Sequence, residues 1–223
     1  MQNIRVRVWD LPTRLFHWSL TLLVVAGVVT AKIAGNAMQW HMRIGLAIGA
    51  LLAFRLVWGF VGGRWSRFAS FAHGPGATLR YLRGRSRDDE HHDVGHSPLG
   101  ALSVFALLAV LAIQVSTGLV ADDEIATTGP LAARVSTATS LAATRWHRNA
   151  GEWLVIGLAL LHVAAIAWFA FARRRNLVAP MLYGDQWHDP SLPSARDDAA
   201  TRALAFAIAA ACAIGAAVVA RLG

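Results

Sequence analysis

Apolar residues dominate five long stretches of the chain, and polar residues are concentrated between them. These stretches lie at residues 15–34, 41–61, 98–120, 147–171 and 202–220. Each approaches the roughly twenty apolar residues that an α-helix needs to cross a bilayer. The pattern predicts an all-α integral membrane protein with a four-helix bundle. The fifth stretch, which is rich in alanine and holds no histidine, is expected to be an additional C-terminal transmembrane helix.

The connections between these stretches differ in length and composition. The link at 35–40 is short, which makes the first two helices antiparallel neighbours. The loop at 62–97 is long, first basic and then acidic, and the loop at 121–146 is expected to form a short external helix. Prolines punctuate the region that follows the fourth stretch, which is typical of a linker. The expected parts are a transmembrane domain at 1–182, a cytoplasmic linker at 183–199 and the C-terminal helix at 200–223.

Composition and charge support a membrane location. Only 15% of the 223 residues are charged, against about 25% in soluble domains. The net charge is +8, but arginines flank the apolar stretches, so a nucleic-acid partner is not expected. The arginines are concentrated at 1–14, 62–97 and 173–175, on one side of the predicted membrane. The positive-inside rule therefore predicts a multi-pass membrane protein with its N-terminus in the cytoplasm.

Four histidines lie in the predicted spans, and alternating helix directions sort them by depth. His41 and His147 fall toward the outer surface, whereas His17 and His162 fall toward the inner one. Fifteen residues at 1.5 Å each put His162 about 22 Å below His147, on broadly the same helix face. Two histidines per level are suited to hold a haem iron through both axial positions. The spacing thus indicates two stacked haems, with the four histidines as iron ligands.

Neighbouring residues add to this hypothesis. A glycine follows each outer histidine by four residues, at Gly45 and Gly151, where a missing side chain leaves room for a macrocycle. Arg14 and Arg55 are candidate partners of haem propionates, since guanidinium groups bind carboxylates well. The alternative for both arginines is that they extend to the membrane interface. The single cysteine, Cys212, excludes a C-x-x-C-H attachment of c-type haem and cysteine-ligated iron–sulfur clusters.

Several motifs resemble those of the bacterial cytochrome b561 family, in the branch of b-type cytochrome subunits of nickel–iron hydrogenases. The similarity covers about residues 5–182. It is carried by Trp-Asp-Leu-Pro-Thr-Arg-Leu-Phe-His-Trp (9–18), Arg-Leu-Val-Trp-Gly-Phe-Val-Gly (55–62), Trp-His-Arg-Asn-Ala-Gly-Glu-Trp (146–153), Leu-His (161–162) and Asn-Leu-Val-Ala-Pro-Met-Leu-Tyr-Gly (176–184). The resemblance implies a location in the bacterial inner membrane, two haem b groups, respiratory electron transport and exchange of electrons with quinone. Its ligand pattern falls on the same four histidines, whereas the fifth apolar stretch departs from the minimal four-helix pattern.

The main functional hypothesis is transmembrane electron transfer between the quinone pool and a periplasmic redox protein, either a hydrogenase or a c-type cytochrome. Membrane lipid and exchangeable quinone are the other expected partners. The sequence leaves open whether the chain has quinone oxidoreductase activity of its own, and no catalytic residue is expected. One alternative is a superoxide oxidase that passes electrons to quinone. A second is a membrane anchor or metal permease without haem.

Overall fold

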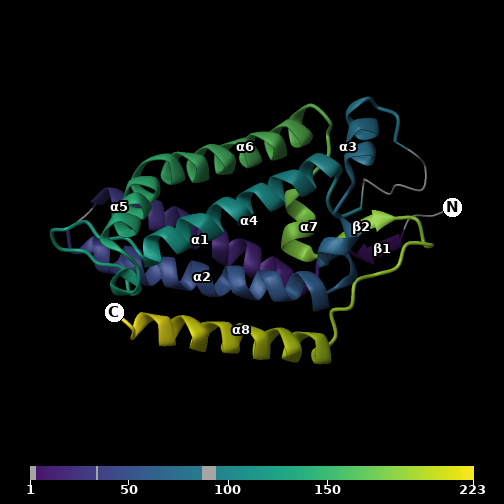
Figure 1. Cartoon of the computed structure of the whole chain (residues 1–223). Helices are drawn as coiled ribbons and strands as arrows, with labels where there is room; N and C mark the ends of the chain where they lie inside the picture. The colour runs from purple at the N-terminus through teal and green to yellow at the C-terminus, as the bar shows by residue number, and fades with distance from the viewer. Residues whose placement is uncertain (1–3, 34, 87–93) are drawn as a thin grey trace. The chain divides into compact units, whose positions relative to one another are not determined.

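The computed structural model describes residues 4–33, 35–86 and 94–223, and it is mostly helical (Figure 1). Five helices are long and apolar enough to cross a membrane. They coincide with the five predicted stretches and confirm the all-α membrane fold. Four of them are single α-helices, namely α1 (Leu11–Ile33), α2 (Ala37–Val61), α4 (Pro98–Leu119) and α8 (Ala199–Ala220).

The fourth candidate span, Thr137–Phe171, is longer than expected at 35 residues. It consists of α5 (Thr137–Trp146), the π-helical segment η4 (His147–Gly151) and α6 (Glu152–Phe171). The helix expected between 121 and 146 is therefore continuous with the span. Ser136 starts it, because its side chain accepts a hydrogen bond from the Thr139 N–H at 3.2 Å. At 1.5 Å per residue the whole length is about 52 Å, more than the roughly 30 Å hydrocarbon core, so part of it extends beyond the bilayer.

Shorter elements surround the helices, and two of them pair as strands. Strand β1 (Ile4–Arg7) pairs antiparallel with β2 (Asp185–His188), with Ile4 opposite His188 (Figure 1). The segment expected to be a linker thus contains a strand, because β1 supplies its backbone partners. The remaining elements are η1 (Arg64–Ser66), η2 (Phe68–Ser70), α3 (Pro75–Leu82), η3 (Ala132–Arg134) and α7 (Val178–Tyr183).

The chain forms two compact units, each described by itself. The first unit comprises Met1–Leu15, Leu56–Ala106 and Leu161–Phe206. The second unit comprises Phe16–Arg55, Leu107–Leu160 and Ala207–Gly223. Several membrane-spanning helices contribute residues to both units.

A buried carboxylate organises the first unit. Asp10 is fully buried, and its Oδ1 accepts hydrogen bonds from the Thr13 N–H at 2.8 Å and the Trp58 Nε1–H at 3.2 Å. Its Oδ2 accepts from the Gly63 N–H at 3.2 Å and from the Ser66 hydroxyl at 2.7 Å. These bonds connect the start of α1 to the end of α2 and to η1, so a polar group fixes the two helix ends.

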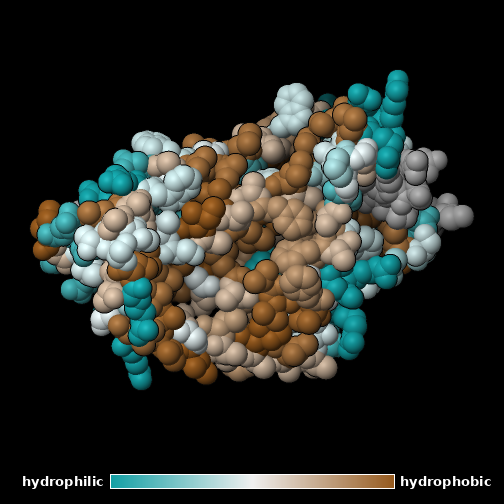
Figure 2. Space-filling view, viewed as in Figure 1, coloured by the Kyte–Doolittle hydropathy of each residue, from teal (hydrophilic) through white to brown (hydrophobic). Residues whose placement is uncertain are grey.

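Close helix contacts organise the second unit. A Cβ built on Gly27 of α1 would lie 3.5 Å from Ile44 of α2, and one on Gly49 of α2 would lie 3.2 Å from Val115 of α4. Small residues at such points let membrane helices approach closely. On the side of α8 that Figure 2 shows, hydrophobic side chains cover its length and hydrophilic ones gather at its two ends. That distribution is typical of a helix that faces lipid.

Candidate functional site

His41 and His147, the predicted outer pair, lie together in the second unit. Their ring centroids are 5.8 Å apart, and the ring planes are inclined by 82°. His41 belongs to the first turns of α2, and His147 opens the π-helical segment η4. π-Helical turns are rare and frequently occur at functional sites. The structure therefore brings together two imidazoles from elements about one hundred residues apart in the chain.

Each of these imidazoles is held by a backbone carbonyl of a neighbouring helix. The Nδ1 of His41 lies 2.9 Å from the carbonyl oxygen of Gly27, and the Nδ1 of His147 lies 2.9 Å from that of Gln114. A carbonyl oxygen only accepts hydrogen bonds, so both Nδ1 atoms carry the proton. In the neutral rings Nε2 is then the atom with a lone pair for a metal. Histidines that ligate metals almost always have this second hydrogen bond, which fixes both tautomer and ring orientation.

Two residues of α4 fix the position of His147. Gln114 donates from its side-chain Nε2 to the His147 carbonyl oxygen at 2.8 Å. That carbonyl lies in the π-helical segment, where the backbone hydrogen-bond pattern changes. One turn further along α4, a Cβ built on Gly118 would come within 2.8 Å of His147 Cε1. The Gln114 bond joins α4 to the backbone of a candidate ligand, a partner that the sequence alone did not identify.

Gly45 and Gly151, the two glycines expected to leave room for a macrocycle, differ in their surroundings. A Cβ built on Gly45 meets nothing within 4 Å, so the space beside His41 is open, as a macrocycle would require. A Cβ on Gly151 would collide with the side-chain oxygen of Gln114 and would lie 2.8 Å from Trp146 Nε1. Gly151 therefore serves the close packing of η4 against α4 in this structure. Its role beside a macrocycle stays a prediction.

The predicted inner pair is divided between the two units. His17 lies on α1 in the second unit, with its ring 5.0 Å from that of Trp18. His162 lies on α6 in the first unit. Each histidine lies on the expected helix, and their pairing stays a prediction.

The two candidate propionate partners differ in burial, since Arg55 is buried and Arg14 is half-buried. Arg55 is only 3% exposed, which argues against an extension to the membrane interface. Arg14 donates from Nη1 to the carbonyl oxygen of Leu182 at 2.6 Å. Its Nε is buried without a hydrogen-bond partner among the residues that the structure describes. A buried guanidinium nitrogen in that state is suited to an anionic partner.

A second polar contact lies one turn beyond His147. Glu152, the first residue of α6, forms an ion pair with Lys32 at the end of α1. The Lys32 ammonium also lies 5.8 Å from the ring centroid of Trp153. Glu152 thus takes part in a salt bridge at the ends of two helices.

Residues 8–184 match the family model of prokaryotic cytochrome b561. The chain belongs to the prokaryotic cytochrome b561 family. Cytochromes b561 are membrane proteins that transfer electrons through b-type haem, and this function applies to the chain at that level. Helix α8 lies outside the matched region. No curated protein and no solved structure matches the chain in the comparisons made.

The residues around the outer pair fit a b-type haem. Haem b is held by its axial ligands and by packing, without the cysteine attachment that c-type haem needs. His41 and His147 present two imidazoles from different helical elements, and Gly45 leaves open space beside one of them. The donor set and the tautomers are therefore those that a bis-histidine haem b requires.

Proposed function

We propose that this cytochrome b561 carries electrons across the bacterial inner membrane through two haem b groups. The outer haem would be held by His41 and His147, and the inner one by His17 and His162. The electrons would pass between the quinone pool and a periplasmic redox protein, with the N-terminus of the chain in the cytoplasm. The proposal rests above all on the matched carbonyl contacts of His41 and His147.

The outer histidines are arranged for axial ligation. The carbonyl oxygens of Gly27 and Gln114 accept a hydrogen bond from Nδ1 of each ring and so keep the proton on that atom. Both Nε2 atoms are then available to iron. Two imidazoles on one iron leave no open coordination position, which favours electron transfer over oxygen binding. A bound haem b supplies an iron that alternates between Fe(II) and Fe(III).

The protein's own task is to keep this arrangement rigid in both redox states. Gln114 holds the backbone of His147, and the missing side chain of Gly118 admits its ring. The carbonyl contacts raise the electron density of the ligating nitrogens, a common means of tuning a metal centre. Little reorganisation of the ligands would then accompany each electron.

The second haem gives the path its length. Fifteen residues separate His147 from His162, which corresponds to about 22 Å along a helix. The buried Arg55 and the buried Nε of Arg14 are our candidates for contacts with haem propionates. Two haems at this spacing would carry electrons across the membrane, a distance that a single haem does not span.

A cavity near the outer pair supports a protein partner over superoxide. It has a volume of about 540 Å³ and contains three carboxylates and two arginines among its lining residues, which are Asp122, Asp123, Glu124, Leu141, Thr144, Arg145, Arg148 and Asn149. Hydrogen bonds from the Thr127, Ala126 and Ile125 backbone lower the pKa of Asp123 to about 2, so it stays charged. A predominantly acidic surface repels the superoxide anion. It suits a basic docking surface on a redox protein.

The haem content of single-histidine variants tests the proposal. The full chain would be purified in detergent, and its haem counted by pyridine haemochrome and reduced-minus-oxidised spectra. We expect about two haem b per chain, and the loss of one in His41→Ala and of the other in His162→Ala. His73→Ala, which changes a histidine outside the long helices, serves as the control and should keep both. No haem, or one haem insensitive to both substitutions, would contradict the proposal.

A further inference from the structure

A second cavity, in the first unit, has a different chemistry from the haem site. It has a volume of about 460 Å³ and lies among the end of α2, the turn into η1 and the segment that enters α8. The residues that line it include the arginines Arg64, Arg67 and Arg196 and the apolar Phe60 and Leu204. None of the residues that line it in the described part of the chain is acidic.

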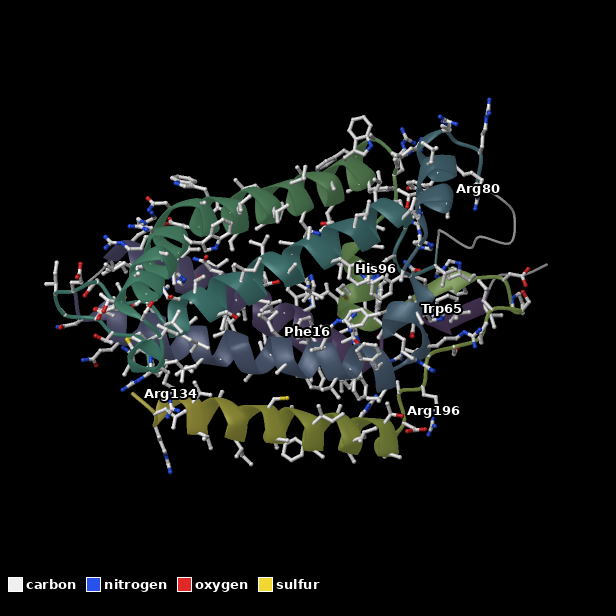
Figure 3. All side chains as sticks on the ribbon, viewed as in Figure 1. Phe16, Trp65, Arg80, His96, Arg134 and Arg196 are labelled. Carbon is white, nitrogen blue, oxygen red and sulfur yellow. The ribbon has the colours of Figure 1, made fainter. Side chains whose placement is uncertain are left out.

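The charge in this cavity is positive and open to a ligand. Arg67 makes no ion pair within the described residues. Arg64 contacts the face of Trp65, 5.8 Å from its ring centroid, which leaves its N–H groups available. Arg196 bonds Asp198 at 3.0 Å, but both side chains are largely exposed, so solvent weakens that pair (Figure 3).

Nearby carboxylates do not cancel this charge. Asp10 lies under the Gly62–Gly63 turn, but it is fully buried and already accepts four hydrogen bonds. Asp197 is occupied by Arg7 at 2.6 Å and by Arg202 at 3.1 Å. The three arginines therefore present a net positive site to an incoming group.

The apolar part of the cavity lies at a membrane boundary. Phe60 is 68% exposed one residue before the end of α2, and Leu204 is 48% exposed in the second turn of α8. Both helices are long and apolar enough to cross the membrane. At their ends the hydrocarbon core gives way to lipid headgroups. Guanidinium groups above exposed apolar side chains at this depth match the two halves of a phospholipid.

We propose that this cavity binds an anionic phospholipid, whose phosphate contacts Arg64, Arg67 and Arg196 and whose acyl chains lie on Phe60 and Leu204. Guanidinium binds phosphate in bidentate fashion, and basic pockets between membrane helices are suited to anionic headgroups. A quinone is neutral and would leave the three arginines without a counter-charge. The bound lipid would connect the end of α2 to the start of α8. The leaflet that supplies the lipid depends on the proposed orientation of the chain, whereas the site itself does not.

Lipid titration of the full chain tests this proposal. Detergent-purified, delipidated protein would be titrated with cardiolipin or phosphatidylethanolamine and analysed by native mass spectrometry. The test variant is Arg64→Gln/Arg67→Gln/Arg196→Gln. The control, Arg83→Gln/Arg85→Gln/Arg173→Gln, removes the same charge from exposed arginines outside the cavity. Each basic residue near an anionic headgroup contributes about fivefold in affinity, so we expect about a hundredfold weaker cardiolipin binding in the test variant only.

Further measurements separate the alternatives. If the triple variant fails to fold, as judged by tryptophan-fluorescence melting, Arg67→Gln alone replaces it as the test variant. We expect this single substitution to weaken cardiolipin binding about fivefold. Equal losses in test and control variants, or none in either, would overturn the proposal. Complete displacement by millimolar inorganic phosphate would point to a free-phosphate site instead. Displacement by a short-chain ubiquinone analogue, with quinone binding lost in the test variant, would assign the cavity to quinone.

Discussion

Gly118 and His147 are in such close contact that no side chain fits between them. A Cβ on Gly118 would lie 2.8 Å from His147 Cε1 and 3.2 Å from its Nδ1. Contacts this short do not occur between real Cβ atoms and a ring, so the ring would have to move. The imidazole is also held by the Gln114 carbonyl oxygen, and the displacement would break that hydrogen bond. The identity of residue 118 thus controls the orientation of a candidate haem ligand.

Gly118→Ala should therefore release the outer haem. We expect the haem content to fall from about two to about one per chain in the pyridine haemochrome assay. The control is Gly157→Ala on α6, where a Cβ meets nothing within 4 Å. Both substitutions add one methyl group to a helical glycine, so loss of haem in Gly118→Ala alone reports the contact with His147. Equal haem content in the two variants would show that the ring position does not depend on Gly118.

The side chain of Gln114 should stabilise the π-helical segment. Gln114→Leu removes the 2.8 Å hydrogen bond to the His147 carbonyl oxygen and leaves that acceptor without its partner. The loss is about 1 kcal/mol, which corresponds to a Tm lower by about 2–4 °C. Gln39→Leu, at an exposed position of α2, is the matched control and should leave the Tm nearly unchanged. Thermal unfolding in detergent, monitored by tryptophan fluorescence, gives the Tm of both variants. Identical unfolding curves for the two variants would refute the stabilising role of Gln114.

The side chain of Asp10 should be needed as a group whose two oxygens both accept hydrogen bonds. Asp10→Asn turns one of the two acceptor oxygens into an NH₂ group that faces donors such as the Ser66 hydroxyl or the Trp58 indole. Burying mismatched donors costs about 1–3 kcal/mol, so we expect a Tm lower by several degrees. Glu124→Gln, in an exposed turn, is the control. A wild-type Tm for Asp10→Asn would mean that a second acceptor oxygen is not needed there.

Span positions were predictable because they depend on local composition. Twenty consecutive apolar residues form a membrane helix whatever they later contact, and four of the five stretches were found within a few residues, whereas the fourth span begins ten residues earlier than predicted. The proximity of His41 and His147 was also predictable, since alternating helix directions put both at the same depth. That reasoning needed only helix rise and the number of crossings.

The details that hold the site required the folded chain. The backbone carbonyls of Gly27 and Gln114 carry no sequence signature, and the π-helical turn at His147 depends on packing against α4. Strand pairing joins residues such as Arg7 and Asp185, which are 178 positions apart. The isolated segment around Asp185 therefore has the composition of a linker, and only its distant partner makes it a strand.

The start of α8 should become less stable as Asp198 is protonated. Asp198 accepts hydrogen bonds from the Thr201 N–H at 2.8 Å and from the Thr201 hydroxyl at 2.7 Å, and it also pairs with Arg196. These contacts, the Thr201 backbone first, lower its pKa from 3.8 to about 2. A lowered pKa means that the folded state favours the charged form. The stabilisation is then complete above pH 3.8 and is lost as the pH falls through about 2.

Asp198→Ala should accordingly lower the Tm at pH 7, because it removes the group that caps α8. The difference from the wild type should narrow as the pH is lowered from 4 to 2, through the range in which the wild-type carboxylate takes up its proton. Asp198→Asn keeps an acceptor at the cap without a titrating charge, so its own melting should show a smaller pH-dependent loss over this range. The nine tryptophans give the fluorescence signal for melting curves at each pH. A gap between wild type and Asp198→Ala that is as wide at pH 2 as at pH 7 would mean that the ionised form of Asp198 does not stabilise the helix.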